Sequence, residues 1–251
     1  NRIARINAAW PVAHFERSLT GIALTALFLT ALVQSFFFDS IPHVTDAVAQ
    51  LFQAKVLARG MLWTPLPLCP EAFINHYLEM TADGRWFAIY PPGHAATLVV
   101  FLWFGCLKLM GPLLTAMSAY FLGRLVRLYS SDGMALLAAA LYAISPLTIL
   151  IGASFMNHIS AQFYVILGIW LAVSAVRRPT LFRGLFAGFA LGMGAITRPQ
   201  DMVLLLPLLF FFLLTELKNF HFTEPGFRGL ILAFIAGAAI PLTGWLMWNH
   251  V

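Results

Sequence analysis

Residues 18–38 read SLTGIALTALFLTALVQSFFF, a stretch without a charged residue in a chain of 251 residues. About 20 apolar residues are enough for a helix to cross the hydrocarbon core of a bilayer. Arg2, Arg5 and Arg17 precede this block, and no small-residue cleavage site follows it. We therefore expect a membrane anchor rather than a cleaved signal peptide.

The composition also indicates a membrane protein. The chain is 61% hydrophobic and only 10% charged, whereas a soluble domain carries about 25% charged residues. Its net charge of +5 does not indicate nucleic acid, because the cations lie between apolar blocks, where they report membrane topology. Cys69 and Cys106 form no CxxC pattern and suggest neither a disulfide framework nor a metal site.

Working outward from the first block, we expect an all-α, polytopic membrane helix bundle of about seven spans, because backbone amides in lipid need internal partners. The predicted spans are Ser18–Phe38, Gly111–Tyr129, Gly133–Gly152, Ile159–Val176, Leu181–Ile196, Met202–Leu217 and Phe227–Trp248. A further apolar stretch, His94–Leu107, would reach about 21 Å, which is short of the roughly 30 Å core.

The positions of Lys and Arg decide whether His94–Leu107 spans. If it does not, and the N-terminus is cytoplasmic, ten of the 15 cations lie inside; if it does, ten lie outside. In the first arrangement the ten cations inside are Arg2, Arg5, Arg17, Arg124, Arg127, Arg177, Arg178, Arg183, Lys218 and Arg228. The positive-inside rule favours the first arrangement, so residues 94–107 should form an interfacial or re-entrant helix. The loop 39–92 and the turns 155–158 and 197–201 then lie outside the cytoplasm.

We expect one membrane module over residues 1–251, with an amphipathic helix over residues 44–60 of the first loop. Its polar stripe, at i, i+4 and i+7, comprises Asp46, Gln50 and Gln53. Thr45 is the expected cap and Gly60 the expected end. Lys55 lies at the edge of the apolar face, where it could reach headgroup phosphates. Because the sequence lacks an initiator Met and stops just after an apolar block, we also expect a longer chain.

The predicted topology brings polar residues to one face of the membrane, where such groups are costly and usually mark a functional site. They are Asp46, Arg85, His94, Asn157, His158, Arg198 and Asp201. Asp83-Gly84 is a turn signal before a strand-like segment at residues 85–90. Small residues at Gly184, Gly188 and Gly192 indicate close helix packing.

In four motifs the chain resembles bacterial members of the GT-C superfamily of membrane glycosyltransferases, which includes protein O-mannosyltransferases and aminoarabinose transferases. The motifs are Asp46 with Phe52-Gln53-Ala54-Lys55 and Gly60; Asp83-Gly84-Arg85-Trp86 running into Tyr90-Pro91-Pro92-Gly93-His94; Ser154-Phe155-Met156-Asn157-His158; and Thr197-Arg198-Pro199. Many members carry Asp-Glu at the start of the loop helix, whereas here Ala47 follows Asp46.

The resemblance implies that a sugar passes from a polyprenyl-phosphate carrier to an acceptor outside the cytoplasm, with inversion at the anomeric carbon. This chemistry needs a base for the acceptor and cations for the phosphate. Asp46 is the candidate catalytic base; its alternative role is a helix N-terminal carboxylate stabilised by the dipole. Arg85 is the candidate phosphate ligand, because arginine binds phosphate through two N–H groups; a headgroup contact or a loop salt bridge is the alternative.

The other candidates for substrate or phosphate binding each have a structural alternative. His94 could donate to phosphate or sugar, or could cap the short helix that follows it. Asn157 and His158 open the fourth span, where His158 could orient the acceptor. Arg198 could neutralise the phosphate or pair with Asp201. Gln50, Lys55 and Tyr90 complete the set.

A divalent metal is allowed but not favoured; His43, Asp46 and His158 are the residues that would hold it. The expected partners are the lipid-linked sugar donor, an acceptor that the sequence does not identify, and the bilayer, without nucleic acid. The expected location is a bacterial inner (plasma) membrane, with a cytoplasmic N-terminus and an extracytoplasmic active site. Two alternatives remain open: a transporter or flippase for lipid-linked sugars, and a non-catalytic scaffold of the same fold.

Overall fold

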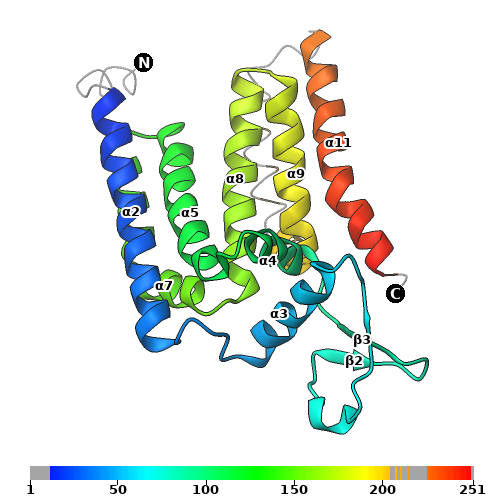
Figure 1. Cartoon of the computed structure of the whole chain (residues 1–251). Coiled ribbons are helices and arrows are strands. Elements are labelled where there is room, and N and C mark those ends of the chain that lie inside the picture. The colour runs from blue at the N-terminus through cyan, green and yellow to red at the C-terminus, as the bar shows by residue number, and fades with distance from the viewer. Residues whose placement is uncertain (1–11, 204–206, 208–209, 211–213, 215–224, 250–251) are drawn as a thin grey trace.

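The chain folds as a bundle of helices with a small antiparallel sheet in its first loop (Figure 1). The computed structural model describes residues 12–203, 207, 210, 214 and 225–249. The elements are α2 Val12–Phe37, α3 Thr45–Leu57, β1 Thr64–Pro65, η1 Pro70–Phe73, β2 Leu78–Met80, β3 Arg85–Ala88, α4 Gly93–Trp103, η2 Leu107–Leu109, α5 Met110–Arg127, α6 Asp132–Ile144, α7 Pro146–Ala153, α8 Asn157–Arg177, α9 Leu181–Thr197 and α11 Pro225–Trp248. The predicted all-α class is confirmed.

Four helices of the described part are long and apolar enough to cross a membrane, namely α2, α5, α8 and α11. The predicted span over Gly133–Gly152 is covered by two helices, α6 and α7, which meet at a bend of 55° and form either one broken span or a re-entrant loop. The bend falls at Ser145-Pro146, where proline lacks the N–H that a continuous helix needs. The predicted span Met202–Leu217 lies mostly outside the described residues, and α9 has only 17 residues. The number of spans therefore stays a prediction.

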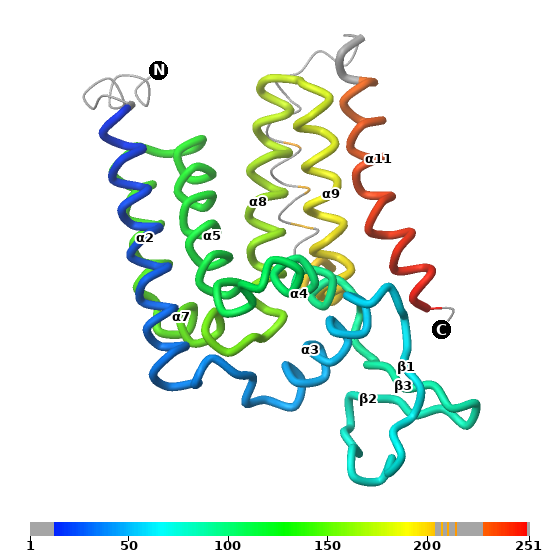
Figure 2. The backbone as a smooth tube through the Cα atoms, in the orientation of Figure 1, coloured from blue at the N-terminus to red at the C-terminus, as the bar shows by residue number. Residues whose placement is uncertain are grey.

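The helices alternate in direction, so one end of the bundle collects α3, α4, the start of α8 and the end of α9 (Figures 1 and 2). We call this the loop end. The opposite end, which we call the arginine end, carries Arg124, Arg127, Arg177, Arg178 and Arg183 near the helix termini there. The polar motifs therefore lie at the same end of the bundle, in line with the alternation of spans predicted from the sequence.

Helix α4 lies across the loop end rather than along the bundle (Figure 1). It has 11 residues and ends before Gly105, whose φ of 66° stops the helix earlier than the predicted Leu107. Its first residue, Gly93, packs directly on the end of α9. A Cβ added there would lie 2.7 Å from the backbone nitrogen of Thr197, so only glycine allows this close approach.

Helix α3 presents its polar stripe to the protein, with Gln50 and Gln53 only 2% and 1% exposed, whereas Val48 is 42% exposed. The helix begins after Val44, whose side chain makes no capping hydrogen bond, so the predicted Thr45 cap is wrong. It ends at Leu57 rather than Arg59. Gly60, with φ of 74°, donates its N–H to the Leu57 carbonyl and closes the helix as predicted.

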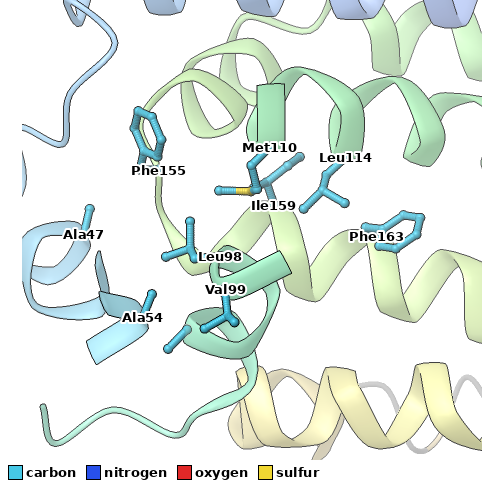
Figure 3. Packing of buried hydrophobic residues seen from close by; sticks show 10 residues of the cluster. Ala47, Ala54, Leu98, Val99, Met110, Leu114, Phe155, Ile159 and Phe163 are labelled. Atoms are coloured by element: carbon cyan, nitrogen blue, oxygen red, sulfur yellow. The ribbon is translucent and has the colours of Figure 1, made fainter. Parts of the chain in front are cut away.

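Small residues of α3 attach it to the bundle through an apolar cluster (Figure 3). Ala47 and Ala54 pack with Leu98 of α4, and Met110 and Ile159 continue the cluster into α5 and α8. Burial of apolar surface at about 25 cal/mol per Å² is what holds the first loop on the bundle. The cluster therefore fixes the position of the neighbouring Asp46.

The glycines of α9 serve close packing, as the sequence predicted. A Cβ on Gly188 would collide with the carbonyl of Phe234 in α11, and a Cβ on Gly237 of α11 would collide with the carbonyl of Leu185. Because the two glycines each admit the partner backbone, α9 and α11 approach along their length.

Candidate functional site

Asp46 lies in the first turn of α3, half-buried, and Tyr90, in the segment between β3 and α4, lies near it. Burial raises the pKa of Tyr90, and the neighbouring Asp46 carboxylate raises it further. The phenol therefore keeps its proton at neutral pH and can serve as a donor.

Tyr77 is a member of this group that the sequence did not single out. It lies beside Tyr90, and the two ring centroids are 5.2 Å apart. The hairpin closed by Asp83-Gly84 sets this pairing, because Leu78 stands opposite Ala88 and the Ile89 N–H donates to the Tyr77 carbonyl. Extending the register from the predicted turn would have placed Tyr77 close to Tyr90.

Arg198, just after α9, is held by three side chains. Its Nε donates to Asp201 at 2.6 Å, and its Nη1 donates to Asn157 at 3.1 Å and to Nε2 of His158 at 2.9 Å. The two alternatives of the sequence, a phosphate ligand or a pair with Asp201, are compatible, because the pair uses only Nε. Within the described part of the chain, Nη2 makes no hydrogen bond to the protein.

His158 links the residues around Asp46 with the residues around Arg198. It is the second residue of α8 and lies near enough to Asp46 for the carboxylate charge to act on its ring. The structure thereby gathers five predicted site residues, drawn from α3, the segment after β3, α8 and the turn after α9. They are Asp46, Tyr90, Asn157, His158 and Arg198.

His94 is placed for the fold rather than for substrate. Its Nε2–H donates to the Phe155 carbonyl at 3.0 Å, and its Nδ1 accepts from the Ser160 hydroxyl at 2.8 Å. The side chain is 1% exposed, and burial lowers the pKa of His94, so the ring is neutral. Both ring nitrogens are therefore occupied by the protein, and His94 ties α4 to the turn before α8.

The two buried glutamines of α3 differ. Gln53 donates through Nε2 to the Leu62 carbonyl at 2.9 Å and accepts through Oε1 from the Ala88 N–H at 2.8 Å. It joins β3 to the chain that leaves α3. Gln50 is equally buried, but its Oε1 has no hydrogen-bond partner among the described residues. Gln50 therefore stays a candidate for substrate contact.

Two further cations were predicted for the site, Arg85 and Lys55. Arg85 pairs with Asp83 at 2.8 Å and lies over the ring of Trp63 at 5.5 Å. Trp86, the next residue, stacks on Phe52 of α3 at 4.4 Å, so strand alternation turns Arg85 away from α3. Lys55 is exposed on the apolar side of α3.

The structure does not assemble the three residues suggested for a metal. His43 donates from Nε2 to the Phe38 carbonyl at 2.9 Å. Among the residues that the structure describes, no three His, Cys, Asp or Glu side chains come together as a metal site.

A family model described as dolichyl-phosphate-mannose-protein mannosyltransferase matches residues 106–248, which is more than half of the chain. The match includes Asn157, His158 and Arg198 and begins after Asp46 and Tyr90. No individual curated protein matches the chain. The apolar helices agree with the family's membrane location. The chain therefore belongs to the dolichyl-phosphate-mannose-protein mannosyltransferase family and is an integral membrane glycosyltransferase that uses a lipid-linked sugar.

Proposed function

We propose that this chain moves a sugar from a polyprenyl-phosphate carrier to an acceptor hydroxyl or amine, with inversion at the anomeric carbon. The observation that carries the proposal is the Arg198 guanidinium, which is fixed through Nε and Nη1 while Nη2 remains unbonded to the described protein. An arginine held in this way can offer its remaining N–H groups to a phosphate oxygen without reorganising.

Asp46 is the proposed base. The acceptor atom attacks the anomeric carbon and passes its proton to the Asp46 carboxylate. The bond between the anomeric carbon and the phosphate oxygen breaks, and its electron pair leaves with the phosphate, which Arg198 binds. Tyr90, beside the carboxylate, is the proposed donor that holds it in position.

We further propose that the reaction takes place at the outer face of a bacterial plasma membrane. The excess of Lys and Arg near the arginine end favours a cytoplasmic location for that end, with the N-terminus. The loop end then faces outward. Exposed Trp103 and Phe104 at the end of α4 suit the water–lipid boundary. Lys55 and Arg85 are proposed contacts for the carrier as it approaches the site.

The direct test is sugar transfer by an Asp46→Asn variant in detergent or vesicles. We expect transfer to fall by about 10²–10⁴-fold, the usual contribution of a general base, while carrier binding persists. Asp39→Asn is the matched control, because Asp39 is an exposed carboxylate shortly before α3. Full activity of Asp46→Asn would exclude it as the base. Carrier binding without transfer by the unaltered chain would instead favour a flippase or scaffold.

A further inference from the structure

The tautomer of His158 is set by its neighbour. The Nε2 atom lies 2.9 Å from Nη1 of Arg198. A guanidinium has only N–H donors, so this nitrogen of the imidazole must be the acceptor. A neutral imidazole that accepts at Nε2 carries its proton on Nδ1. Arg198 therefore fixes His158 as an Nδ1–H donor.

The Nδ1–H of His158 finds no acceptor among the described residues. The Nδ1 atom is buried and has no hydrogen-bond partner among the described residues. Buried polar atoms in native structures are nearly always hydrogen-bonded, so an orphaned donor beside a candidate site calls for a ligand or an ordered water. His94, by contrast, lies on an adjacent element with both ring nitrogens satisfied.

The chemistry of the surroundings selects the ligand class. His158 and Arg198 share a hydrogen bond, and together they keep two sets of unused N–H groups, at Nδ1 and Nη2. No acceptor is left over on either side chain, so the pair suits an oxygen-rich anion. A phosphate oxygen fits, because it accepts several hydrogen bonds at once.

We propose that His158 is a direct ligand of the donor's phosphate group, donating from Nδ1–H to an oxygen that Arg198 also binds. The proposal rests on the proposed function and assigns His158 a fixed role as a donor, not as a base. When the bond to the anomeric carbon breaks, negative charge grows on the phosphate. A donor already aimed at that oxygen binds more strongly in the transition state than in the ground state.

Two substitutions separate this role from simple support of Arg198. Counted in bonds from Cβ, the amide nitrogen of asparagine stands where Nδ1 stands, and the amide oxygen of glutamine stands where Nε2 stands. His158→Asn keeps the orphaned donor and gives up the acceptor for Arg198. His158→Gln keeps the acceptor and gives up the donor.

We expect His158→Gln to lose about 10²-fold or more in transfer, chiefly in kcat. We expect His158→Asn to retain about a tenth or more of wild-type activity, the effect of losing one ordinary hydrogen bond. If His158 only positions Arg198, the order of the two variants reverses, and that reversal overturns the proposal. So does wild-type activity of His158→Gln.

A second measurement distinguishes failure of this inference from failure of the proposed function. Binding of a sugar-free polyprenyl monophosphate is followed by the thermal shift of the purified chain in detergent. If the unaltered chain neither binds this probe nor transfers sugar, the proposed function fails. If it does both and His158→Gln binds the probe as tightly as His158→Asn, the His158 assignment alone is wrong. The exposed His76, changed to Gln, is the control for folding and yield.

Discussion

The two ends of the bundle are built from the same residue types but leave their hydrogen-bonding groups in different states. At the arginine end, Arg127 forms two parallel bonds to Asp132 at 2.8 and 3.1 Å, and Arg124 bonds to Glu16 at 3.0 Å. Aromatic rings cover both guanidinium groups, Phe15 over Arg127 and Trp170 over Arg124. Two cations and two carboxylates from α2, α5 and α6 thus neutralise one another.

At the loop end, the polar and charged groups leave some of their hydrogen-bond donors unused. Arg198 uses Nε and Nη1 and keeps Nη2, while the His158 Nδ1 is buried without a described partner. Asp46 has the neutral Tyr90 phenol beside it and forms no ion pair with a described residue. The contrast teaches that residue type does not separate a structural arginine from a functional one; what separates them is the donors that packing leaves unused.

Replacing arginine by lysine at each end is the strongest test of this contrast. Arg198→Lys should lower transfer by about 10²–10³-fold, because a single ammonium cannot serve Asp201, Asn157 and a phosphate in one fixed fork. Arg124→Lys should leave transfer near the wild-type value and lower thermal stability instead. Parallel assays of transfer and thermal unfolding check both, and equal losses of activity would show that the two ends do not differ as described.

A second carboxylate beside Asp46 should lower the stability of the fold, unlike the two acids of the arginine end, which pair with arginines. Ala47 is fully buried in the apolar cluster that attaches α3 to α4. Ala47→Glu would place a charge there without a partner, at a cost of about 3–5 kcal/mol in the free energy of unfolding. The Asp-Glu pair of many relatives is thus not restored by this change.

Denaturation of the purified variants measures this effect. Thr45→Glu is the control, since Thr45 is exposed in the same helical turn, where an acidic residue is stabilised by the helix dipole. Similar unfolding of the two variants would mean that the space around Ala47 opens to water.

The sequence predicted the features that depend on local pattern. Hydropathy predicted the membrane class, and the alternation of spans predicted which segments meet at the loop end. Asp83-Gly84 predicted the turn of the hairpin. The bend at Pro146 was also available from the sequence, because proline inside an apolar block interrupts helical hydrogen bonding.

The pair of Arg198 with Asp201 was among the predicted alternatives, but the long-range pairings within the site could not be predicted, because they join residues far apart in the chain. Arg198 meets Asn157 across 41 positions, and His94 meets Ser160 across 66. Periodicity assigns a residue to a face of a helix but does not name the neighbour on that face. For the same reason the burial of Ala47 and the satisfied ring of His94 emerge only from packing.

One side chain, Gln53, supplies hydrogen bonds that join the hairpin to α3 at the loop end, whereas several ion pairs join the helices at the other end. Gln53→Leu would leave the Leu62 carbonyl and the Ala88 N–H without their partner. The buried Ala88 N–H left unsatisfied costs about 1–3 kcal/mol, whereas Leu62 is exposed and its carbonyl can turn to water, so we expect a local loss of about 1–3 kcal/mol. Hydrogen exchange should accelerate at Ala88, while Lys55→Leu, an exposed change on the same helix, should leave that amide protected.

The smallest expected effect is the pH dependence of stability that comes from the buried His94. Burial lowers the pKa of His94, so the folded chain keeps this ring neutral while the unfolded chain protonates it near its ordinary pKa of about 6.5. Stability from this source is complete above that pKa and is lost as pH falls toward the lowered folded value. Between pH 7 and pH 5 the loss is at most about 2 kcal/mol.

His94→Gln should be less stable at pH 7 but should lose less on acidification, whereas His76→Gln should keep the full pH dependence because His76 is exposed. Thermal unfolding at the two pH values measures both slopes. An unchanged slope in His94→Gln would mean that the ring accepts a proton inside the folded protein, and that its bonds to Phe155 and Ser160 yield at mild acidity.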